Sequence, residues 1–66
     1  MVNKEPRGEL AYWVRARRYR VRALDSLQLA KTAMVAEARD RYLTIAQHYE
    51  NLAETEERAA KQTRFR

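Results

Sequence analysis

The sequence has no cysteine, and only one glycine, one proline and one histidine among its 66 residues. The absence of cysteine excludes disulfide bridges and thiolate metal sites, and a single histidine excludes a histidine-rich metal site. Domains of this size bury only about 60% of the surface of the unfolded chain and usually need disulfides, metals or oligomerisation as a supplement. Oligomerisation is the supplement that remains, so we expect the chain to self-associate.

Long apolar runs are also missing. No run approaches the roughly 20 residues that span a bilayer, and the opening "MVNKEPRGEL" has no apolar core of the kind that a secretory signal needs. We therefore expect a cytoplasmic protein. An arginine-rich helix with a tryptophan can also lie on a membrane surface. Here the apolar positions are rich in alanine, which suits helix packing better, so we do not expect a membrane partner.

Helix-breaking residues occur only near the start, at Pro6 and Gly8. The composition that follows, dominated by Ala, Leu, Arg, Glu, Lys and Gln, favours helix. Asn3 is a candidate N-cap, with Pro6 in the first turn. We predict an all-α chain with a lead over 1–8, a first helix over 9–34, a second helix over 37–62 and a frayed tail over 63–66.

The sequence leaves two arrangements of these helices open. A single helix would be about 80 Å long and would imply a coiled coil. An antiparallel hairpin would turn near "TAMVAEA" (32–38), where no Gly, Pro or Asn marks a turn. Charge favours the hairpin. Residues 1–36 carry a net charge of +5 and residues 37–66 carry none, and folding the chain near Val35 brings the basic "RARRYRVR" (15–22) to the acidic "ENLAETEE" (50–57).

In such a hairpin, residue i lies opposite residue 71 − i, a rough rule of antiparallel geometry. The rule places Arg15 near Glu56 and Glu57, Arg17 near Glu54, and Arg20 near Glu50 and Asn51. Exposed ion pairs contribute only about 0.2–1 kcal/mol each. They would therefore select the arrangement more than they stabilise it.

Apolar residues on the first helix form two neighbouring stripes. The first stripe has coiled-coil spacing and consists of Tyr12, Ala16, Tyr19, Ala23, Leu27, Ala30 and Met34. The second consists of Leu10, Trp13, Val14, Val21, Leu24 and Val35. The second helix has one main stripe, Ala38, Tyr42, Ile45, Ala46, Tyr49, Leu52 and Ala53. A two-helix hairpin needs a stripe only about 100° wide, so the first helix has a second surface to bury, and we predict a dimeric four-helix bundle.

Side chains of the first helix are also the candidates for a protein interface. Aromatic and arginine residues are enriched in interaction hot spots, although apolar residues at helical spacing are more often core. The predicted protein-interface residues are Tyr12, Trp13, Ala16, Tyr19, Ala23, Leu27, Ala30 and Met34.

The stretch "EARDRYLTIAQHYENLAETEE" (37–57) resembles the second half of a group of small helical-hairpin proteins from alphaproteobacteria. The shared pattern is EAR, an apolar residue, "IA", an aromatic, "E" and "LAE". The group has a Ser/Thr-Asp-Pro type of turn before "EAR", where this chain has "MVA". The resemblance implies a short helical hairpin with its turn made differently, and it implies no biochemical activity.

The sequence contains no set of residues arranged for catalysis or for binding a cofactor. His48 has no cysteine and no second base near it, so a nucleophile, a base and an orienting group cannot be assembled. Position 45, three residues before His48, is Ile, which breaks the Glu-x-x-His pattern of di-metal bundles. We expect no enzyme activity, no cofactor and no metal.

Two functional hypotheses remain. The first is a non-catalytic helical interaction module that forms a homo-oligomer or binds a partner protein. The alternative is a small basic protein that binds RNA or DNA. Arg15, Arg18 and Arg22 share one edge of the first helix, and we expect these three to contact phosphates. The sequence leaves open whether the arginines bind nucleic acid or pair with Glu50, Glu54, Glu56 and Glu57.

Overall fold

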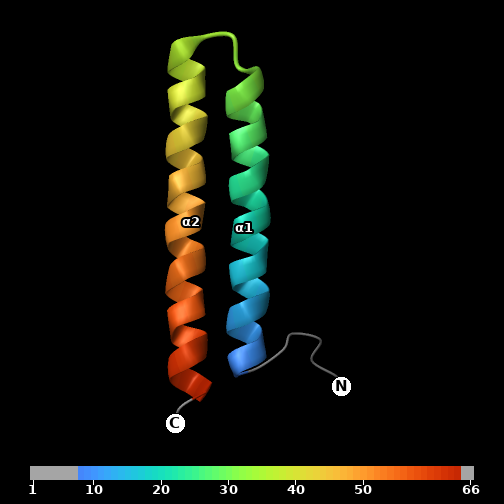
Figure 1. Ribbon diagram of the computed structural model, residues 1–66, viewed down its shortest axis with the longest axis vertical. Helices are drawn as coiled ribbons and strands as arrows, with labels where there is room; N and C mark the ends of the chain where they lie inside the picture. The colour runs from blue at the N-terminus through green and yellow to red at the C-terminus, as the bar shows by residue number, and fades with distance from the viewer. Residues whose placement is uncertain (1–7, 65–66) are drawn as a thin grey trace, which may run out of the picture.

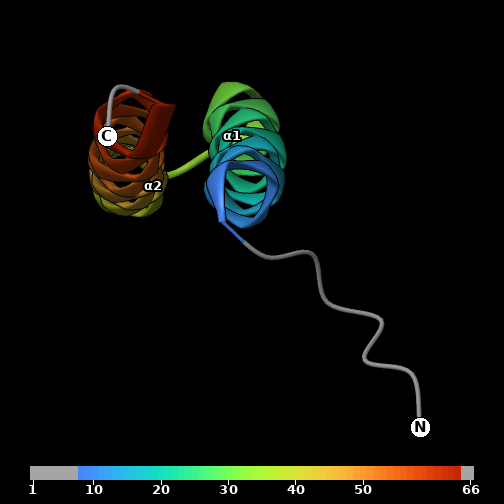
Figure 2. The same ribbon diagram turned by 90° about the horizontal axis from the view of Figure 1, so that it is seen from below.

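The computed structural model describes residues 8–64, which form two antiparallel helices joined by a short turn (Figure 1). Helix α1 spans Glu9–Thr32 and helix α2 spans Ala36–Arg64. Seen end-on, the two helices lie side by side in one layer (Figure 2). The predicted all-α helical hairpin is confirmed, and the alternative of one long coiled-coil helix is wrong. No helix within residues 8–64 has the length and the apolar content to cross a bilayer.

Helix α1 begins directly after Gly8, whose backbone has φ 65° and ψ −141°. This region of conformational space is essentially restricted to glycine. The carbonyl of Gly8 accepts a hydrogen bond from the amide of Ala11 at 3.1 Å, and no side chain caps this end of α1. Asn3, Pro6 and most of the predicted lead lie outside the described residues.

Residues 33–35 make the turn without any glycine, proline or asparagine. Ala33 adopts an extended conformation, φ −69° and ψ 130°, which takes the chain away from the axis of α1. The carbonyl of Val35 then accepts the amide hydrogen bond of Arg39 at 3.0 Å, which opens α2. Helix α1 thus ends two residues earlier than predicted. Helix α2 starts one residue earlier and includes residues 63 and 64 of the expected frayed tail, while residues 65–66 lie outside the described part.

The contact between the helices is built from alanine. Six alanines form this seam, three from each helix at a spacing of seven residues, and each is at most 4% exposed: Ala16, Ala23, Ala30, Ala46, Ala53 and Ala60. Seven residues are close to two turns, so each set lies on one side of its helix. Side chains this small let two helix backbones approach closely. Ser26 is buried beside this alanine seam, and no buried side-chain polar atom in residues 8–64 lacks a hydrogen-bond partner.

Large side chains surround the alanine seam instead of filling it. The rings of Tyr19 and Tyr49 stack across the hairpin, with centroids 6.1 Å apart and an interplanar angle of 30°. Every residue of the stripe predicted for the second helix is buried or half-buried. No large side chain in the described chain is fully buried, so the buried interior of the hairpin consists of the six seam alanines and Ser26.

Candidate interaction surfaces

Two of the arginines in 15–22 hold α1 to α2. The Nε of Arg15 donates to Oε1 of Glu56 at 3.0 Å, and the Arg15 guanidinium lies 5.0 Å from the centroid of the Tyr12 ring. Arg20 donates twice to Glu57, from its NH2 group to Oε1 at 3.0 Å and from Nε to Oε2 at 3.4 Å. Both acids lie on α2, so the basic and acidic runs do meet, as the charge pattern predicts.

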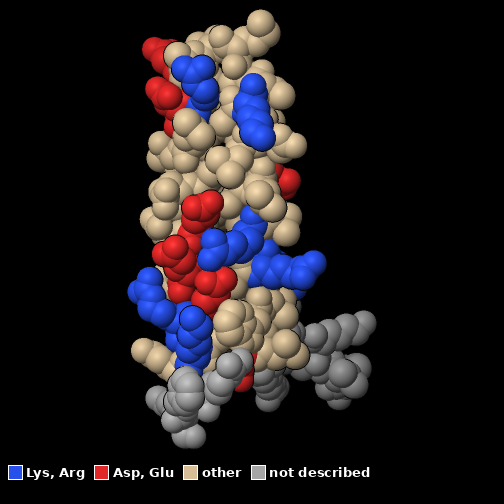
Figure 3. Space-filling view, viewed as in Figure 1, with Lys and Arg blue, Asp and Glu red and all other residues tan. Residues whose placement is uncertain are grey.

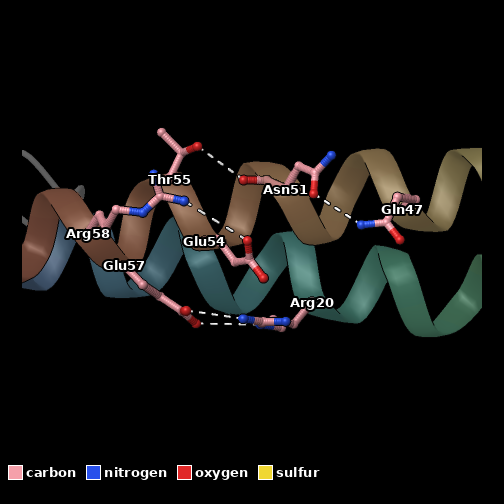
Figure 4. Close-up of polar contacts among 7 residues, drawn as sticks. All are labelled: Arg20, Gln47, Asn51, Glu54, Thr55, Glu57 and Arg58. Carbon is pink, nitrogen blue, oxygen red and sulfur yellow. Dashed lines mark hydrogen bonds and ion pairs between the residues drawn. The ribbon is translucent and has the colours of Figure 1, made fainter.

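Arg20 pairs with a different acid from the one predicted. Its two bonds to Glu57 form a fork, the stronger geometry for an arginine and a carboxylate (Figure 4). The pKa of Arg20 is raised above its usual value, first by the side-chain hydrogen bond to Glu57 and then by the charge of that carboxylate. Glu54 and Glu50 add smaller contributions, and desolvation opposes them.

Asn51, which the antiparallel rule also places near Arg20, makes its hydrogen bonds within α2. Its side-chain oxygen accepts a hydrogen bond from the Gln47 amide at 3.0 Å, and its backbone carbonyl accepts one from Thr55 (Figure 4). The predicted pair of Arg17 with Glu54 is wrong. Arg17 is exposed, and the carboxylate of Glu54 lies 4.0 Å from Arg58, one turn along the same helix.

One face of the hairpin therefore carries charges of both signs. Figure 3 shows acidic and basic side chains interleaved over the lower half of this face. Glu54, Glu57, Arg58 and Lys61 line a shallow depression there. On this face Glu57 pairs with Arg20, and Glu54 lies 4.0 Å from Arg58, so these two arginines are partly neutralised by acids of α2.

Arg18 and Arg22 have a different setting. Both are exposed and lie one turn apart on α1, and neither forms an ion pair with an acid among residues 8–64. Together with Tyr19 and Tyr49 they line a groove of about 260 Å³ between the helices, which we call the tyrosine groove. Of the three arginines predicted to contact phosphates, Arg18 and Arg22 are available, whereas Arg15 is occupied by Glu56 and Tyr12.

The contribution of Tyr49 to this groove was missed at the level of sequence. A signal for it was present, because the antiparallel rule that pairs Arg15 with Glu56 also places Tyr49 opposite Arg22. The periodicity of the sequence places Tyr49 only in the apolar stripe of the second helix. Its ring also lies beside that of the exposed His48, with centroids 6.1 Å apart and planes tilted by 60°, but His48 does not line the groove.

The residues predicted for a protein interface are mostly used inside the hairpin. Ala16, Ala23 and Ala30 are buried against α2 and cannot contact a partner of the folded chain. Tyr12, Trp13, Tyr19 and Leu27 are half-buried, and the indole of Trp13 donates to Glu9 at 2.9 Å. Met34 lies in the turn and is 97% exposed. This stripe faces α2 because its alanines allow the closest approach of two helices.

The second stripe of α1 is the one that remains exposed. Leu10 is 60% exposed, Val21 49% and Leu24 62%, and Val14 is half-buried. These four residues lie on the solvent-facing side of α1, beside the stripe that contains the alanine seam, and we call them the outer strip. Their exposure leaves a row of aliphatic side chains in water.

Within residues 8–64, no group of three or more His, Cys, Asp or Glu side chains could hold a metal ion. His48 is exposed, and the structure brings no nucleophile or second base to it among the contacts of the described chain. The surfaces that stand out are therefore the outer strip, which is apolar, and the tyrosine groove, which is cationic and aromatic.

Comparison with known proteins finds no matching family, no similar curated protein and no similar solved structure. The resemblance of residues 37–57 to alphaproteobacterial helical-hairpin proteins accordingly stays a prediction.

Proposed function

We propose that the protein is a non-catalytic interaction module that acts by self-association through the outer strip, with two hairpins packed into a four-helix bundle. The observation that supports it most is the exposure of Leu10, Val21 and Leu24 beside a seam made only of alanine. Burying an alanine methyl contributes on the order of 0.8 kcal/mol, whereas burying a whole Leu or Val side chain contributes about 1.5–3 kcal/mol. A second chain on the outer strip would bury the larger side chains.

Charge favours a second copy of the chain as the occupant. Asp25 is the only acid of α1 beyond Glu9, and it lies eight residues after Arg17. Two α1 helices packed antiparallel about Val21 would bring Asp25 of each copy to Arg17 of the other. Arg17, Arg18 and Arg22 flank Val21, so the two Arg17–Asp25 pairs would offset part of this positive charge and select the antiparallel orientation.

Sedimentation velocity over a range from low to high micromolar concentration tests this proposal. We expect a dimer at the upper end for the wild type and a monomer throughout for the double variant Leu10→Gln/Leu24→Gln. Leu29→Gln/Leu43→Gln is the matched control, since it removes two leucines that are 48% and 44% exposed outside the outer strip. A folded wild-type monomer at every concentration, or a dimer that only the control pair disrupts, would contradict the proposal.

A further inference from the structure

We propose that the tyrosine groove binds single-stranded nucleic acid, with Arg18 and Arg22 on phosphates and the Tyr19–Tyr49 pair as a platform for a base. Arg18 and Arg22 also flank Val21 of the outer strip, whereas Tyr19 and Tyr49 stack on each other across the hairpin, so the aromatic half of this site lies outside the outer strip. The proposal rests on the meeting of two exposed guanidinium groups with two aromatic rings in one groove.

No acid among residues 8–64 forms an ion pair with the arginines of this groove, and the nearest acid along α1 is Asp25, one turn after Arg22. The four acids of "ENLAETEE" (50–57) are used elsewhere: Glu56 binds Arg15, Glu57 binds Arg20, Glu54 contacts Arg58, and Glu50 adds to the field at Arg20. Guanidinium groups are weakly hydrated and donate in a fixed fork that matches phosphate geometry. Arg18 and Arg22 are one helical turn apart on α1, so both can contact a single backbone that crosses the groove.

The rings of Tyr19 and Tyr49 favour a single strand over a duplex as the ligand. Proteins that bind single strands without sequence preference combine a cationic groove with aromatic side chains on which unpaired bases stack. A duplex keeps its bases stacked inside, so it would contact Arg18 and Arg22 but not the tyrosine rings. A membrane surface needs an apolar face that enters the lipid, whereas this groove is lined by two arginines and two phenols.

Fluorescence anisotropy with a labelled oligothymidylate and a labelled oligouridylate tests the proposal on the full chain. The double variant Arg18→Gln/Arg22→Gln should weaken binding at least tenfold. It should also flatten the plot of log affinity against log salt by about 1.4, because each phosphate contact on a single strand contributes a slope of about 0.7. Arg39→Gln/Arg41→Gln is the matched control, since it removes the same charge from two exposed arginines of α2 that line neither the groove nor the outer strip.

The aromatic half of the site needs a test of its own. Tyr49→Leu keeps an apolar side chain in the groove and should weaken binding about fivefold or more, the lower end of the effect of losing one base-stacking contact. It should leave the salt slope unchanged. Circular dichroism of each variant at the binding temperature verifies that the hairpin is still folded.

Several outcomes would overturn the proposal. An equal loss in the control double variant would mean that net charge alone drives binding. Equal affinity for a duplex of the same length, or an undiminished affinity of Tyr49→Leu, would remove the platform role of the tyrosines. Equal dependence on Arg18 and Arg22 for vesicles containing phosphatidylserine would identify an anionic membrane as the ligand.

Discussion

The two sides of α1 reverse the usual distribution of side-chain sizes. The side that faces α2 presents Ala16, Ala23 and Ala30, each at most 4% exposed, while the solvent-facing side leaves Leu10 and Leu24 about 60% exposed. Large aliphatic residues usually lie inside and small ones are tolerated anywhere. In this chain the alanine seam fixes how closely the helices approach, and the outer strip holds the apolar area that the hairpin does not use.

The comparison shows that a buried surface need not be the most hydrophobic one. Close approach of two backbones is available only where both helices present small side chains, since each Leu in the seam would push the axes apart. The residues with the largest area then have no place inside a two-helix hairpin. They become the surface on which a further helix can pack.

The largest effect on stability is expected from enlarging a residue of the alanine seam. Ala53 is 0% exposed, and Ala53→Leu should destabilise the hairpin by about 3 kcal/mol or more, because the added atoms have no space between the backbones. Thermal unfolding followed by circular dichroism measures the effect. Ala36→Leu, at the exposed first residue of α2, should leave the unfolding temperature almost unchanged. A stabilised Ala53→Leu protein would show that the seam is not closely packed.

A smaller loss is expected from the tyrosine pair that borders the seam. Tyr49→Leu removes the stacking on Tyr19 but keeps an apolar contact, so the free energy of unfolding should fall by about 0.5–1.5 kcal/mol. Urea denaturation of the wild type, the two single Leu variants and the double variant gives the coupling between the rings. Additive effects of the two substitutions would mean that the stacked geometry contributes nothing of its own.

The ion pair of Arg15 with Glu56 should contribute less than the tyrosine pair. Its atoms are 3.0 Å apart, with side chains 43% and 21% exposed, and a double-mutant cycle with Arg15→Gln and Glu56→Gln should give about 0.2–1 kcal/mol. The coupling should shrink as salt is added. The same cycle on Glu54 and Arg58, which are 4.0 Å apart and more exposed, should give a smaller coupling, and the reverse order would contradict this ranking.

The smallest effect on the isolated hairpin is expected on the outer side of α1. At low micromolar concentration Leu24→Gln should change the free energy of unfolding by no more than about 0.5 kcal/mol, because an exposed side chain has few contacts to lose. At high concentration the same substitution should lower the unfolding temperature, since it removes the stabilisation contributed by the dimer. Urea and heat denaturation at both concentrations make this measurement, and a large loss at low concentration would place Leu24 inside the hairpin.

Much of the fold could be predicted from the sequence, and less of the candidate sites. The absence of Gly and Pro after Gly8 indicates helix, and the meeting of the runs 15–22 and 50–57 indicates the hairpin. The pair of Arg15 and Glu56 follows from the same antiparallel rule. The pair of Arg20 and Glu57 does not follow from this rule, because long arginine and glutamate side chains extend along the helix axis and need not bind the residue directly opposite. Of the residues that line the tyrosine groove, the sequence predicts Arg18 and Arg22 as phosphate ligands but does not predict that Tyr49 lies beside them.

Residues 9–32 and 37–62 are helical, and α1 has two apolar stripes, as local propensity and periodicity in the sequence predict. The turn near residues 33–35 follows from the charge pattern of the runs 15–22 and 50–57, which are distant along the chain. Only the packing of α1 against α2 fixes which side of α1 faces inward and which of its arginines pair with acids of α2. Periodicity gives the direction of a side chain around its helix, but the distance between helices depends on the facing alanines of both. That distance places Glu56 and Glu57 within reach of Arg15 and Arg20, and leaves Arg18 and Arg22 beside the tyrosines.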